Sequence, residues 1–113
     1  MDLGKKPTHM AAVLDEVVER IAPLVHPRRL ILFGSLARGD ADASSDVDLL
    51  VLVDTGGSRR EIADRIDKAL ADRTFGLDVI VMTSEQFERQ KRVVGTIARQ
   101  AWREGKVLYD SAA

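Results

Sequence analysis

The chain has 113 residues, of which 45% are hydrophobic and 31% charged; its formal net charge is −1 and it has no cysteine. These values are typical of a soluble globular protein, so we expect one domain spanning residues 1–113. They exclude disulfides and thiolate metal sites, and the near-zero net charge argues against direct binding of nucleic acid.

The N-terminal segment, Met1 to Met10, is polar and lacks the apolar core of a signal peptide. No apolar run approaches the ~20 residues that a membrane-spanning helix requires. Since the lack of cysteine also fits a reducing compartment, we expect a cytoplasmic protein with no membrane contact.

An amphipathic helix is predicted first, because apolar residues recur at steps of three and four. Thr8 is its expected N-cap, and Pro23 and Pro27 are expected to end it. The apolar stripe consists of Met10, Val13, Leu14, Val17, Val18 and Ile21.

Two apolar strands follow. Leu30 to Phe33 is closed by Gly34, and Val47 to Val53 is apolar on both faces after its first residues. A strand of the second kind lies inside a sheet with helices on at least one side. Thr55, Gly56 and Gly57 then predict a turn.

The second half of the chain carries two helix-start signals. Ser58 with Glu61, and Thr83 with Gln86, have the spacing of capping boxes. A strand from Leu77 to Met82 is expected between the helices that they open.

Glycines divide the C-terminal segment. Gly95 is expected to interrupt the last helical stretch, Gly105 to be its C′ residue, and Lys106 to Tyr109 to form a final strand. The order helix, strand, strand, helix, strand, helix, strand predicts an α/β or α+β domain with a β-sheet flanked by helices.

Gly34 and Ser35 stand where the first strand ends and a short helical turn is expected. Glycine lets the backbone approach a phosphate closely, and Ser35 adds a hydroxyl and an N–H near a positive helix end. The alternative is an ordinary tight turn with Ser35 as a cap.

Two carboxylates, Asp46 and Asp48, follow Ser35 after ten intervening residues. Residues two apart in an extended segment face the same side, so both carboxylates converge and their repulsion favours an external cation such as Mg²⁺. The alternative reading is a solvated turn at Asp46 and a strand-edge solubiliser at Asp48.

Asp78 interrupts the otherwise apolar strand Leu77 to Met82, where a carboxylate is costly unless it is paired or bound to metal. If this strand neighbours Val47–Val53, Asp78 joins the acid pair. Three carboxylates on adjacent strands would form the minimum scaffold of a two-metal phosphoryl-transfer site.

The spacing of Gly34-Ser35, Asp46-x-Asp48 and Asp78 resembles the DNA polymerase beta-like nucleotidyltransferase superfamily. The run Gly34-Ser-Leu-Ala-Arg-Gly39, the ending Ser45-Asp-Val-Asp-Leu49 and the small size are similar to the minimal nucleotidyltransferases. The resemblance covers about residues 28–82, and the tail Arg103 to Tyr109 is also typical of these proteins.

This resemblance implies a mixed sheet flanked by helices, with Asp46 and Asp48 binding Mg²⁺, two ions in all. Asp78 would be the third acid, which helps to bind the catalytic metal or takes the acceptor's proton. Gly34 and Ser35 would hold the triphosphate. Arg38 occupies a recurrent family position, where it either contacts phosphate or forms a structural salt bridge with a nearby aspartate.

The activity implied by the resemblance is transfer of AMP from ATP to a hydroxyl acceptor. Minimal nucleotidyltransferases are commonly paired with a helical HEPN ribonuclease, which they silence as antitoxins by adenylylating a tyrosine. The alternatives are a non-catalytic antitoxin that blocks its partner by contact, and an enzyme that modifies a small molecule. The oligomeric state stays open.

The C-terminal helical stretch is basic. Its cations could serve nucleotide or partner binding, and the alternative is a solvated helix face. They are Arg89, Lys91, Arg92, Arg99 and Arg103.

Overall fold

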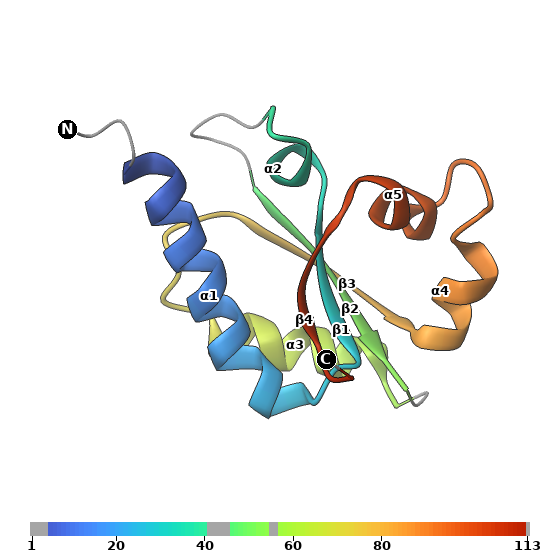
Figure 1. The fold of residues 1–113 in the computed structure, drawn as a ribbon. Helices are drawn as coiled ribbons and strands as arrows, with labels where there is room; N and C mark the ends of the chain where they lie inside the picture. Colours follow the sequence, from blue (N-terminus) through green and yellow to red (C-terminus); the bar gives the residue numbers. More distant parts are fainter. Residues whose placement is uncertain (1–4, 41–45, 55–56, 113) are drawn as a thin grey trace.

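The computed structural model describes residues 5–40, 46–54 and 57–112. In chain order the elements are α1 (Lys5–Val25), β1 (Arg29–Phe33), α2 (Ser35–Arg38), β2 (Val47–Val53), α3 (Arg59–Ala69), β3 (Leu77–Thr83), α4 (Ser84–Gln90), α5 (Ile97–Glu104) and β4 (Lys106–Asp110). Figure 1 shows α1 and α3 on one side of the sheet and α4 and α5 on the other.

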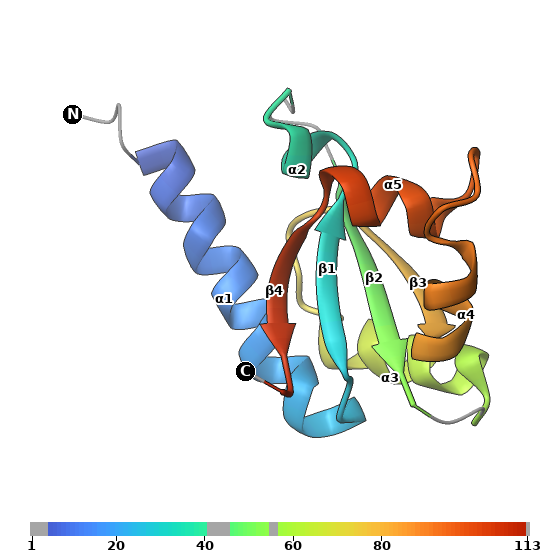
Figure 2. The same ribbon diagram turned by 45° about the vertical axis from the view of Figure 1, so that its right-hand side comes forward.

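The sheet is mixed, with strand order β3-β2-β1-β4. Strand β1 runs antiparallel to both β2 and β4, whereas β2 and β3 are parallel. Figure 2 shows the four strands side by side. The expected α/β class, the mixed sheet and the interior place of β2 are confirmed.

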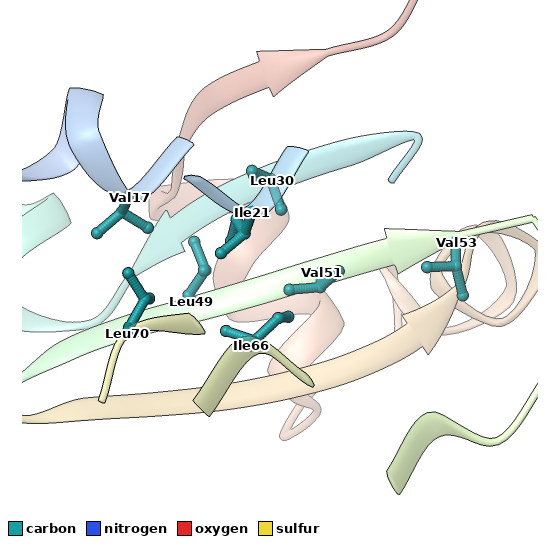
Figure 3. Packing of buried hydrophobic residues seen from close by; sticks show 8 residues of the cluster. All are labelled: Val17, Ile21, Leu30, Leu49, Val51, Val53, Ile66 and Leu70. Carbon is teal, nitrogen blue, oxygen red and sulfur yellow. The ribbon is translucent and has the colours of Figure 1, made fainter. Parts of the chain in front are cut away.

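Strand β2 is buried on both faces because each face is covered by two helices. Leu49 and Val51 pack in the cluster beneath α1 and α3, which Figure 3 shows from close by. Leu50 and Leu52 point to the opposite side and pack with Phe87 of α4 and the alanines of α5. This alternation follows from the two-residue period of a strand.

The predicted caps of α3 and α4 are confirmed. The Ser58 hydroxyl accepts a hydrogen bond from the Glu61 N–H at 3.2 Å, and the Thr83 hydroxyl accepts one from Gln86 at 3.0 Å. Gly95 does separate two helices, with a φ of 90° between α4 and α5. The predicted turn includes Thr55 and Gly56, which lie outside the described residues.

The predicted start of the first helix is wrong, because the helix begins at Lys5 and Thr8 lies inside it. Its predicted end is right in part: the helix continues through Pro23 but stops at Val25, two residues before Pro27. His26, which precedes Pro27, takes a positive φ of 50°, and a residue before proline disfavours the helical region.

Gly105 is also different from the prediction, because its φ of −76° is not left-handed. A Cβ at position 105 would lie 2.7 Å from the Ile31 side chain and 2.9 Å from the Leu32 carbonyl oxygen. The glycine therefore serves the close approach of α5 to β1. Across the described ranges, no helix is long and apolar enough to span a bilayer.

Candidate active site

Asp48 and Asp78 lie side by side on the parallel strands β2 and β3. They are direct partners in the strand register, and Phe33 of β1 is the partner of Asp48 on its other side. Because the two acids precede Leu50 and Ile80 by two residues, they face the α4–α5 side of the sheet. The sequence predicted that Asp78 lies beside Asp46 and Asp48, and the strand register confirms this for Asp48.

The Gly34 turn brings the backbone against Asp48. Gly34 has a φ of 78°, a left-handed value that favours glycine, and it precedes the single turn of α2. A Cβ at position 34 would overlap Oδ2 of Asp48 and lie 3.1 Å from its Cγ. Because Gly34 has no side chain, the backbone at the end of β1 can lie against the Asp48 carboxylate.

Asp46 lies against a second glycine, Gly76, which directly precedes β3. The Val47 N–H donates to the Gly76 carbonyl at 2.8 Å, and a Cβ at position 76 would overlap Oδ1 of Asp46. Gly76 was not among the predicted site residues. Its place directly before β3, two residues before Asp78, is the signal that could have identified it.

The acids repel one another. Partial burial raises the pKa of Asp48 most, followed by the charge of Asp78, a hydrogen bond with Asp78 and the charge of Asp46, while Arg38 lowers it. Like charges that are held together disfavour ionisation, and a cation between them would relieve this cost.

Arg38 reaches the site from α2. Its Nε lies 3.2 Å from Oδ2 of Asp40, and one terminal nitrogen lies 3.6 Å from Oε1 of Glu104. The structure therefore contains the predicted salt bridge with a nearby aspartate, together with a contact to Glu104 that the sequence did not indicate. Both ion pairs are partly exposed and hence weak, so Arg38 can exchange them for another anion at little cost.

The donor set suits a hard divalent cation, because it consists of carboxylate oxygens whose charge is opposed only in part by Arg38. Two glycines make room for the carboxylates where side chains would fill the space. In the part of the chain that the structure describes, no three acidic or histidine side chains gather closely enough to hold one ion by themselves. Further oxygen ligands, such as those of a triphosphate, would complete the coordination.

The raised pKa of Asp48 predicts a pH dependence of folding stability. Above both its folded and its unfolded pKa the carboxylate is ionised in both states, and the folded protein bears the full repulsion. As pH falls through the raised folded pKa towards the ordinary 3.8, the folded state takes up the proton first and the repulsion disappears. Asp48→Asn should therefore be more stable than wild type at pH 7, by an amount that shrinks towards pH 4.

Urea unfolding of both proteins across this pH range, without divalent metal, would measure the difference. A gap that stays constant or grows on acidification would contradict the repulsion. Asp64→Asn, at an exposed position of α3, is the control.

Comparison with known proteins decides the family. The family model described as the nucleotidyltransferase domain matches residues 13–104, which include every residue of this site. The chain belongs to the nucleotidyltransferase family. The expected family and fold are thus confirmed.

Two candidate protein adenylyltransferases of Methanocaldococcus jannaschii are similar to this nucleotidyltransferase. The first is 34% identical over 82 residues, which cover 73% of this chain and 78% of the relative. The second is 42% identical over 53 residues, or 47% of this chain and 52% of the relative.

Solved structures share the fold at lower identity. A candidate nucleotidyltransferase from Sulfolobus solfataricus has a TM-score of 0.64 at 20% identity, covering 93% of this chain and 84% of that one. A toxin–antitoxin structure with AMP-PNP has a TM-score of 0.54 at 24% identity, covering 86% and 73%. A tri-AMPylated Shewanella oneidensis HEPN toxin in complex with its MNT antitoxin has a TM-score of 0.51 at 21% identity, covering 88% and 71%.

Proposed function

We propose that this nucleotidyltransferase transfers AMP from ATP to a hydroxyl of a protein, in a reaction that depends on Mg²⁺. The observation that carries the proposal is the direct pairing of Asp48 with Asp78 beside the Gly34 turn. The relatives from M. jannaschii support a protein as acceptor, since both are named as adenylyltransferases of proteins.

In the proposed reaction the acceptor oxygen forms a bond to the α-phosphorus of ATP. The bond from that phosphorus to the oxygen bridging to the β-phosphate breaks, and pyrophosphate leaves. When bound at Asp46 and Asp48, with Asp78 beside them, two Mg²⁺ ions would supply positive charge that stabilises the phosphate oxygens and the leaving group.

The remaining roles belong to the residues of this chain. The backbone of Gly34 and Ser35, together with the Ser35 hydroxyl, would bind the triphosphate. Arg38 would turn from Asp40 and Glu104 towards a phosphate oxygen. A carboxylate oxygen of Asp78 would accept the proton that the acceptor hydroxyl loses.

The acceptor that we propose is a tyrosine of a HEPN ribonuclease, with this chain as the antitoxin. The support comes from the shared fold with MNT antitoxins that are found in complex with HEPN toxins. Incubation with a purified HEPN partner, ATP and Mg²⁺ should increase the partner's intact mass by one or more AMP groups. Protection of cells by this chain without added mass would instead indicate a non-catalytic antitoxin.

Asp78→Ala tests the proton-accepting role. Loss of a general base costs ~10²–10⁴-fold in rate, so transfer should fall by that factor while ATP and partner still bind. Single-turnover transfer and calorimetric ATP binding would be compared with those of Asp64→Ala on α3. A variant with wild-type transfer would remove Asp78 from the reaction.

A further inference from the structure

The turn between α4 and α5 exposes apolar side chains. Val94 is 82% exposed and Val93 is 51% exposed. Trp102 of α5 is 43% exposed, although Lys91 and Arg92 lie over its ring at 5.4 and 5.2 Å from the centroid. We call these five residues the α4–α5 patch.

Hydrogen bonds fix the backbone conformation of the turn that carries the patch. The Thr96 hydroxyl donates to the carbonyls of Gln90 and Val93 at 3.0 and 2.9 Å and accepts from the Arg99 N–H at 3.1 Å. Lys91 is fixed between Trp102 and Glu88, whose carboxylate lies 2.6 Å from the ammonium group. Since its geometry is set in advance, a partner would lose little entropy in ordering it.

The charge around the patch has the opposite sign to that of the rest of the chain. Between positions 85 and 106 there are six cations and three acids, which leaves 11 of the 17 basic and 15 of the 18 acidic residues elsewhere. The acids are Glu85, Glu88 and Glu104, which lie within ion-pair distance of Arg89, Lys91 and Arg38. The cations are Arg89, Lys91, Arg92, Arg99, Arg103 and Lys106. An apolar centre with a cationic rim fits an acidic surface that also has an apolar centre.

The patch belongs to the helix layer on the same side of the sheet as the two paired acids. Ala98 and Ala101 of α5 pack on Ile31, Phe33 and Leu50. Asp48 is the next residue of β2 on that side, two positions before Leu50. A protein bound to this layer therefore lies on the same side of the sheet as the two carboxylates. Figure 2 shows α4 and α5 together on one side of the four strands.

We propose that the α4–α5 patch is the docking surface for the acceptor protein, and that the acceptor meets it with acidic side chains around an apolar centre. The inference rests on the proposed function and adds where the acceptor binds and what its surface is like. A protein fits better than RNA, because the most exposed patch residues, Val93 and Val94, offer a nucleic acid neither a stacking face nor a hydrogen bond. The Trp102 ring, which could stack on a base, already lies under Lys91 and Arg92.

The test uses the full chain, an extract of the source cells and ATP radiolabelled at the α-phosphorus. In the patch variant Val94→Glu/Arg92→Glu, both substitutions oppose an acidic partner at exposed positions. The matched control Leu24→Glu/Arg60→Glu makes the same changes on α1 and α3, in the opposite helix layer. Calorimetry with ATP and Mg²⁺ reports separately on the nucleotide site of each protein.

With limiting extract, the patch variant should label the acceptor protein at least ~10-fold more slowly than wild type, a loss of about 1.4 kcal/mol in docking. The control should match wild type, and all three proteins should bind ATP equally. Equal labelling by the patch variant would overturn the docking surface but leave the proposed function intact. Labelling that is lost after ribonuclease treatment would indicate a nucleic-acid partner, and this result would also overturn the docking surface. If wild type labels no protein, the proposed function itself fails.

Discussion

The double variant Asp46→Asn/Asp48→Asn should lose nucleotide transfer by at least ~10³-fold. Metal ions contribute several kcal/mol of charge stabilisation to a phosphoryl transition state, and each 1.36 kcal/mol is a factor of ten. Asparagine keeps the shape of both side chains but removes the charges that would hold Mg²⁺. The rate of AMP transfer to acceptor, at saturating ATP and Mg²⁺, measures the loss.

The same variant should be at least as stable as wild type without metal. Burial and the neighbouring acids raise the pKa of Asp48, so its ionised form destabilises the folded state at neutral pH. Mg²⁺ with ATP should raise the melting temperature of wild type and have little effect on the variant. An inactive variant that is also unfolded by circular dichroism would leave the metal role without support, and an active one would disprove it.

Gly34→Ala should be the most damaging single methyl addition at the site. Gly34 combines a φ of 78° with a ψ of −157°, a backbone region that glycine alone enters readily, and a residue with a Cβ would lose about 1–3 kcal/mol there. The new Cβ would also overlap the Asp48 carboxylate, which must then leave its present position between Gly34 and Asp78. We expect transfer to fall ~10²-fold or more, since small misplacements of reacting groups cost that much.

Gly39→Ala separates these two causes. Gly39 has a similar φ of 85°, but nothing lies within 4 Å of where its Cβ would be. Both variants should lose stability from backbone strain, about 1–2 kcal/mol for Gly39→Ala, whose ψ of 10° is αL, and about 1–3 kcal/mol for Gly34→Ala, whereas only Gly34→Ala should lose transfer. Urea unfolding and single-turnover rates would be measured on both. If the two variants lose transfer equally, the close approach of Gly34 to Asp48 has no catalytic importance.

Much of the site could be predicted because its signals are local. Asp48 and Asp78 each stand near the start of a strand, and they become direct partners when β2 and β3 pair. The alternation of β2 places Leu50 and Asp48 on one face. Glu104 was missed because its contact with Arg38 joins segments far apart in the chain. Gly76 was missed, although it precedes Asp78 by two residues, because a glycine before a strand is an ordinary turn signal. The bounds of the first helix were predicted incorrectly because tertiary packing outweighs local signals such as the proline at position 23.

The central claim is that the paired acids beside Gly34 catalyse transfer of a nucleoside monophosphate. In the most direct test, the chain, its acceptor and Mg²⁺ are incubated with ATP that carries the label at either the α- or the γ-phosphorus. We predict that only the α-label enters the acceptor, that the γ-label appears in pyrophosphate, and that Asp46→Asn/Asp48→Asn abolishes both. Entry of the γ-label alone would indicate phosphate transfer instead, and would contradict the account.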